Sequence, residues 1–145
     1  MIDKNFLAAV VDTLVPGGAL ANGVVAPAAS TVGVAEGLAS DASDHRQAGT
    51  LRSVLAAIAQ ASGGETVFAS GSEELRIAAL KRVEALRPQD FLVLATAVLI
   101  RYYEHPSVVT AFGWTARPPQ PLGHAMPPFD PALLKPVIKR GKPRR

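Results

Sequence analysis

The chain contains no cysteine, no long apolar run and no export signal at its start. Without cysteine it can form no disulfide, no thiolate metal site and no cysteine nucleophile. Its longest apolar stretch, Phe91 to Ile100, is far shorter than the roughly 20 residues that span a bilayer. We therefore expect no transmembrane segment and interpret this stretch as part of a buried helix.

The first residues also lack the features that direct a protein out of the cytoplasm. Met1 to Asn5 show no basic segment followed by a long apolar run, and no twin-arginine pair lies nearby. We expect a cytoplasmic protein on this basis. Location in the periplasm, by export together with a partner, stays open as the alternative.

The chain is long and apolar enough for one folded domain, but its charge is unevenly distributed. It has 145 residues, of which 48% are hydrophobic, and a net charge of +3. From Arg117 to Arg145 there are seven basic residues and one acidic residue, so this segment carries +6. The remainder has eight basic and eleven acidic residues, or −3. An acidic body with a basic tail is an asymmetry that suggests an interaction partner.

Apolar residues at helical spacing predict several helices. The first runs from Ile2 to Val15 and ends at Pro16, and the second runs from about Gln47 to Ala61. Residues 17 to 44 are expected to form a long loop that contains one short helix, residues 32 to 39.

Three further helices are expected in the second half of the body. Ser70 and Glu73 have the spacing of a capping box, and the helix after them should reach Leu86 with Leu75, Ala79, Val83 and Leu86 directed inward. Pro88 starts the next helix. Its stretch Phe91 to Ile100 is apolar on all sides, so the helix must lie in the middle of a bundle or against a partner. A short helix should run from Pro106 to Phe112.

After Trp114 the chain changes character. Eight of its twelve prolines lie between Pro118 and Pro143. Proline fixes φ and removes backbone donors, so this arm should be extended and close to polyproline II. The sequence thus predicts an all-α fold, with a bundle of about five helices over residues 1–114 and an extended arm over residues 115–145.

No group of residues suggests catalysis by this chain. His45, His105 and His124 are isolated from one another and have no metal-ligand spacing. His105 is best explained as a cap of the helix that Pro106 starts. For His124, insertion into a partner's site is the less favoured interpretation. No glycine-rich nucleotide-binding motif occurs. We expect no catalytic, cofactor-binding or metal-binding residue.

Large aromatic residues gather close to the root of the arm. These aromatics have two interpretations, namely that they close the core or that they form an interface patch, and the two are compatible. The residues are Tyr102, Tyr103 and Trp114. The basic C-terminus has the charge of a nucleic-acid tail, but the acidic body offers no basic face to continue a phosphate track. Nucleic acid is therefore not the expected partner.

Two segments resemble a known family. Leu7 to Gly18 reads LAAVVDTLVPGG, and Arg101 to Pro136 reads RYYEHPSVVTAFGWTARPPQPLGHAMPPFDPALLKP. Together they resemble the gluconate 2-dehydrogenase subunit 3 family, in the order Asp12 to Gly17, Tyr102-Tyr103, His105-Pro106, Gly113-Trp114 and Arg117 to Gly123. The resemblance covers the two ends. Between them, about residues 19 to 85 agree with the family only in length and in pattern.

The resemblance implies a non-catalytic small subunit of a flavin-dependent dehydrogenase. In that family the large partner is typically a glucose-methanol-choline type oxidoreductase that carries FAD and oxidises sugars or other alcohols. Two features depart from many members, because this chain shows neither a twin-arginine signal nor a cysteine that could bond to the partner. The expected partner interface consists of Tyr102, Tyr103, His105, Phe112, Trp114, Pro118, Pro119, Pro121, Leu122 and His124.

A second hypothesis belongs to a different class. Pro118 to Pro121 contains the Pro-x-x-Pro spacing that aromatic grooves accept. The chain would then be a stand-alone adaptor whose proline-rich basic tail binds other proteins or nucleic acid.

Overall fold

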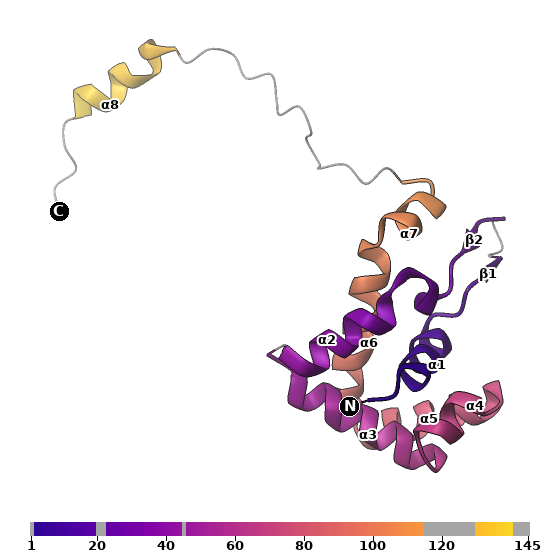
Figure 1. Cartoon of the computed structure of the whole chain (residues 1–145). Coiled ribbons are helices and arrows are strands. Elements are labelled where there is room, and N and C mark those ends of the chain that lie inside the picture. Colours follow the sequence, from indigo (N-terminus) through magenta and orange to yellow (C-terminus); the bar gives the residue numbers. More distant parts are fainter. Residues whose placement is uncertain (1, 20–22, 45, 115–129, 141–145) are drawn as a thin grey trace.

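The protein is helical, with one small sheet (Figure 1). The structure is a computed structural model that describes residues 2–19, 23–44, 46–114 and 130–140. Five α-helices have more than six residues, which confirms the expected all-α bundle of about five helices. The elements in chain order are α1 (Lys4–Leu14), β1 (Gly18–Ala19), β2 (Val25–Ala26), η1 (Ala29–Val32), α2 (Val34–Asp44), α3 (Ala48–Ser62), α4 (Glu65–Ser70), α5 (Glu73–Leu86), α6 (Pro88–Glu104), α7 (Pro106–Ala111), η2 (Pro131–Leu134) and α8 (Lys135–Arg140).

Helices α1 and α3 form close to where their apolar spacing predicts. Asp3 caps α1 by accepting a hydrogen bond from the Phe6 N–H at 2.9 Å. Helix α3 ends at Gly63, whose φ of 92° suits only glycine at low cost. The large apolar side chains of α3 are all buried, namely Leu51, Val54, Leu55 and Ile58.

The start and the end of α5 differ from the prediction. Ser72, not Ser70, caps the helix by accepting from the Leu75 N–H at 3.3 Å. The Ser70 side chain instead donates to the Thr66 carbonyl within α4. Leu86 is exposed, because the helix ends there and its last turn passes the edge of the core. Leu75 is only half-buried, whereas Leu80, which was not expected to face inward, is buried.

Residues 17 to 44 are more regular than the expected long loop. Strands β1 and β2 pair antiparallel, with Gly18 opposite Ala26. The turn η1 follows, and α2 is longer than the expected helix over residues 32–39. Gly17 lies so close to Ala28 that a Cβ there would sit 2.5 Å from the Ala28 nitrogen. The high content of small residues therefore serves close packing rather than looseness.

One continuous core joins the helices of the body. Helix α1 packs against α2 and α4, and α3 packs against α2, α4, α5 and α6. The rings of Phe6 and Phe68 meet edge to face with centroids 5.4 Å apart. The fully buried side chains include Leu7, Val10, Val11, Val34, Leu38, Leu94 and Val98.

The arm is not extended throughout, because the described residues 130–140 contain η2 and α8. Asp130 starts this element by accepting from the Ala132 N–H at 2.8 Å, and Pro131 occupies the first turn, where proline is tolerated. The expectation of polyproline II was wrong for residues 131–140. Residues 115–129 and 141–145 lie outside the described part. Among the described helices none is long and apolar enough to span a bilayer.

Candidate partner-binding surface

Helix α6 has a buried face that carries part of the core. Phe91, Leu94, Val98 and Tyr102 follow one another at intervals of three or four residues and are all buried. Tyr102 is only 1% exposed, and its hydroxyl donates to the Pro27 carbonyl at 2.8 Å. Burial raises the pKa of the Tyr102 hydroxyl above its usual range, with a smaller contribution from Tyr103.

A second face of α6, about 100° round the helix from the buried one, is apolar as well, yet it is exposed. Leu92, Leu99 and Tyr103 are 60%, 43% and 55% exposed. Their spacing of seven and four residues places them on one side of the helix, so they form a row, here called the outer stripe. Helix α6 therefore does not lie in the middle of the bundle, and its outer apolar row has no covering element among the described residues.

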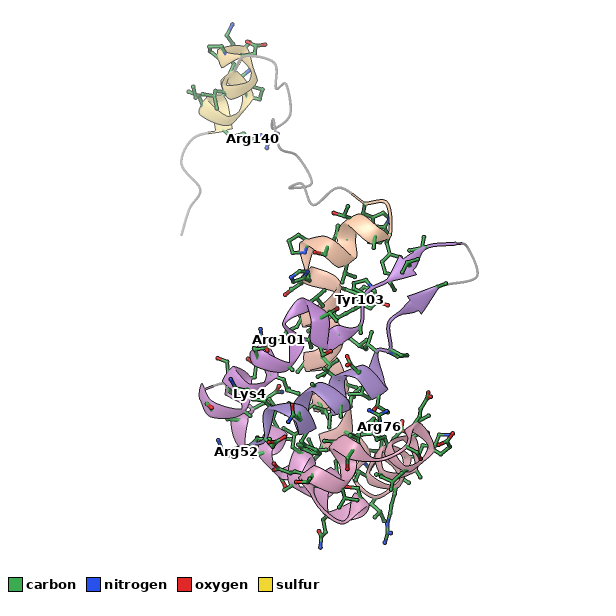
Figure 2. The ribbon with its side chains drawn as sticks, turned by 45° about the vertical axis from the view of Figure 1, so that its right-hand side comes forward. Lys4, Arg52, Arg76, Arg101, Tyr103 and Arg140 are labelled. Atoms are coloured by element: carbon green, nitrogen blue, oxygen red, sulfur yellow. The ribbon has the colours of Figure 1, made fainter. Side chains whose placement is uncertain are left out.

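Aromatic residues continue this surface beyond the end of α6. Figure 2 marks Tyr103 close to where α6 leads into α7. The Tyr103 ring meets the Tyr102 ring edge to face at 5.2 Å and the half-buried Phe112 ring at 6.0 Å. These contacts hold the exposed Tyr103 ring in place.

Trp114 is presented by an anchored backbone. Gly113 has a φ of 75° and ends α7 by donating to the Thr110 carbonyl at 2.9 Å. The Trp114 N–H then donates to the Val109 carbonyl at 3.0 Å, while the side chain is 74% exposed. A large aromatic side chain held in solvent by a fixed main chain is the arrangement expected of an interface anchor.

A polar rim borders the outer stripe on one side. A half-open groove of about 280 Å³ runs between α2, α3 and α6, with Ile100, Arg101 and Glu104 on its α6 side. Arg101 forms a two-armed ion pair with Asp41, in which Nε donates to Oδ2 at 2.7 Å. A Cβ on Gly37 would lie only 2.7 Å from Arg101 Nη1. Because glycine has no side chain at this position, the Arg101 guanidinium can lie against α2. An apolar centre beside a charged rim is typical of protein interfaces.

Residues from both ends of the chain meet at one segment, Pro27 to Ser30. Asp12 accepts from the Ser30 N–H at 2.8 Å and from the Ser30 hydroxyl at 2.7 Å. Gly17 packs on Ala28, and Tyr102 binds the Pro27 carbonyl from the other side. Asp12, Gly17 and Tyr102 thus join α1, η1 and α6, which gives the two resembling segments a structural role.

No protein-family model, curated protein or solved structure matches the chain. The family resemblance therefore rests on the residues quoted above. Within the described ranges there is no group of three or more His, Asp or Glu side chains placed to hold a metal ion.

The predicted interface residues have different surroundings in the structure. Tyr103 and Trp114 are exposed, and Phe112 packs between surface and core. Tyr102 is a core residue, so a direct contact with a partner does not fit its burial. His105 caps α7 by accepting from the Ser107 N–H at 3.3 Å, as the capping interpretation expected. Pro118, Pro119, Pro121, Leu122 and His124 lie outside the described residues.

Sequence reasoning did not single out Leu92 and Leu99 as surface residues. The signal was present in the stretch Phe91 to Ile100, which has more apolar positions than one buried helix face can use. The sequence left two possibilities for this stretch, burial on all sides within a bundle or contact with a partner. It did not indicate which of the side chains would be exposed.

Proposed function

We propose that the chain is the non-catalytic small subunit of a flavin-dependent alcohol or sugar dehydrogenase. The observation that carries this proposal is the exposed outer stripe of α6, whose Tyr103 ring contacts Phe112. Trp114 is a further exposed aromatic side chain just after α7. Large contiguous apolar patches are uncommon on proteins that act alone and often mark an interface. The resemblance of residues 7–18 and 101–136 to the gluconate 2-dehydrogenase subunit 3 family supplies the identity of the partner.

The partner would be a large subunit of the glucose-methanol-choline type, and it would hold the FAD. The outer stripe would lie against that subunit and bury Leu92, Leu99 and Tyr103. Burial of apolar surface contributes about 25 cal/mol per Å², and Trp114 would add an anchor of the kind that dominates protein interfaces. This chain would hold no cofactor itself.

The role of the small subunit would be to stabilise its partner. A chain that binds only the folded large subunit shifts that subunit's folding equilibrium by mass action. The anchored elements on either side of the stripe favour this role, since Tyr102 and the Arg101–Asp41 pair keep α6 rigid against the core. Pre-ordered surfaces lose less entropy on binding.

Co-expression with a flavin-dependent dehydrogenase encoded beside this chain tests the proposal. We expect the large subunit to be soluble, loaded with flavin and active when the chain is present, and to lose at least one of these properties without it. Flavin absorbance, soluble yield and dye-linked alcohol or sugar oxidation measure the three properties. A large subunit that is equally soluble, loaded and active alone contradicts the proposal.

A chain that ends after Trp114 separates the body from the arm. We expect the truncated chain to keep its helical circular dichroism and to bind the large subunit much more weakly, because two linked contacts bind more tightly than either alone. Calorimetric titration against the purified large subunit measures the loss. Unchanged affinity would show that residues 115–145 take no part in the complex.

A further inference from the structure

The last described element of the chain combines exposed aliphatic side chains with positive charge. Leu134 and Ile138 are 44% and 73% exposed, and their spacing of four residues places them one turn apart. Lys135 and Lys139 have the same spacing and form the neighbouring row. Arg140 ends α8, as Figure 2 shows. The element is therefore a short helix with an apolar row beside a basic row.

The charge of this region is of one sign. Residues 131–145 contain six basic residues and no acidic residue. Three of the six, Lys135, Lys139 and Arg140, lie in α8. Residues 1–116 carry eleven acidic and eight basic residues, so the body is negative. An anionic surface would attract the C-terminal element and repel the body, which would orient the molecule.

A nucleic acid uses only part of this chemistry. Residues 131–145 contain no aromatic side chain to stack on bases and no asparagine or glutamine to bind base edges. Binding to phosphates would also leave Leu134 and Ile138 in water. The aliphatic row therefore has no role on a nucleic acid.

A groove on a protein is also a poor fit. Helices that dock in grooves use anchors at positions i, i+3 or i+4, and i+7. Among the side chains that the structure describes in this element, Leu134 and Ile138 are the exposed large aliphatic ones, and the position seven residues after Leu134 is Gly141. An anionic bilayer surface uses both rows, because cations bind the headgroups and short aliphatic side chains enter the boundary below them.

We propose that η2 and α8 bind an anionic lipid surface, with Lys135, Lys139 and Arg140 at the headgroups and Leu134 and Ile138 in the acyl boundary. Binding is peripheral, because no described helix is long and apolar enough to span a bilayer. The proposal does not depend on a dehydrogenase partner. It rests only on the exposed row of α8 and the charge beside it.

Flotation of the full chain with lipid vesicles tests this proposal. We expect binding to vesicles of phosphatidylcholine mixed with phosphatidylglycerol, none to pure phosphatidylcholine, and weaker binding at high salt. The triple change Lys135→Gln, Lys139→Gln and Arg140→Gln should lower the partition coefficient on the order of 100-fold, since each cation near such a surface contributes about fivefold. The double change Leu134→Ser and Ile138→Ser should lower it by about tenfold or more.

A charge-matched variant provides the control. Lys4→Gln, Lys81→Gln and Arg82→Gln remove three exposed cations from the body and should leave vesicle binding unchanged. Equal binding to both vesicle types overturns the proposal, as does an equal loss in the control triple. Tighter binding to a DNA duplex, insensitive to the Leu134 and Ile138 changes, would replace the lipid by nucleic acid. Dependence of a protein complex on α8 without any vesicle binding would replace it by a protein groove.

Discussion

The two faces of α6 carry similar side chains in opposite surroundings. Leu94 and Leu99 are both leucines of one helix, yet the first is fully buried in the core and the second is 43% exposed. Tyr102 and Tyr103 are neighbours in sequence, yet one binds the Pro27 carbonyl inside the protein and the other projects outward. The helix thus has one apolar face that the bundle covers and one that it does not.

This difference indicates where a partner would act. Apolar side chains stabilise the isolated chain only where its own fold buries them. The side chains of the outer stripe are exposed, so they contribute less to that stability. Substitutions on the inner face should therefore reduce the stability of the chain. The same substitutions on the outer stripe should reduce stability much less and should reduce partner binding.

The largest expected difference is between two identical substitutions on the two faces. Leu94→Ala should lower the free energy of unfolding by about 3 kcal/mol, because it leaves a cavity in the core. Leu99→Ala should lower it by about 1 kcal/mol or less, because 43% of Leu99 is already exposed to solvent. Urea unfolding followed by circular dichroism measures both. Equal losses would mean that α6 is covered on both sides.

The aromatic anchors should show the reverse pattern. Trp114→Ala and Tyr103→Ala should each weaken binding to the flavin-carrying subunit by about 2 kcal/mol if they are interface anchors. Trp114→Ala should leave the unfolding midpoint unchanged, since its side chain is exposed. Ile77→Ala, which removes exposed apolar surface from α5, is the matched control. Titration calorimetry measures the affinities, and a loss as large in Ile77→Ala would contradict the assignment.

The hydroxyl of Tyr102 should have a smaller effect. Tyr102→Phe removes the hydrogen bond to Pro27 and leaves a carbonyl without that partner, which should lower the free energy of unfolding by about 1 kcal/mol. Tyr103→Phe keeps its ring in place and serves as control. The two variants are compared by urea unfolding. No difference between them would show that the join between α6 and Pro27 is unimportant.

The smallest expected effect is a dependence of stability on alkaline pH. Burial raises the pKa of Tyr102 in the folded state, so the protonated group stabilises the fold below the usual tyrosine pKa. That contribution should be lost as the pH rises through the raised pKa. Tyr102→Phe should flatten the dependence of the unfolding midpoint on pH above about 10. An unchanged slope in this variant would assign the dependence to other groups.

Local signals predicted much of the fold. The apolar spacing of α3 and the glycine after it were enough to define that helix, since both depend on nearby residues. Ser70 was predicted as the cap because it precedes Glu73 by three residues, but its hydroxyl binds within α4 and Ser72 caps α5. Residues 17 to 44 were predicted as a loop because small residues give a weak periodic signal.

Contacts between distant residues could not be predicted in the same way. The Arg101–Asp41 pair joins residues 60 positions apart, and its path depends on Gly37. The Asp12–Ser30 and Tyr102–Pro27 hydrogen bonds likewise depend on how α1, η1 and α6 meet. For the candidate surface, the sequence indicated Tyr103 and Trp114 but could not tell them from the buried Tyr102.

The sequence by itself determined that this chain is helical, that its charge is divided between an acidic body and a basic tail, and that the stretch Phe91 to Ile100 of α6 is apolar on every side. These properties follow from residue spacing and composition, which need no tertiary contact. Only the tertiary structure decided which apolar face of α6 is buried. The reason is physical: a bundle covers one side of an outer helix, and the side it covers depends on how the helices pack rather than on the helix alone.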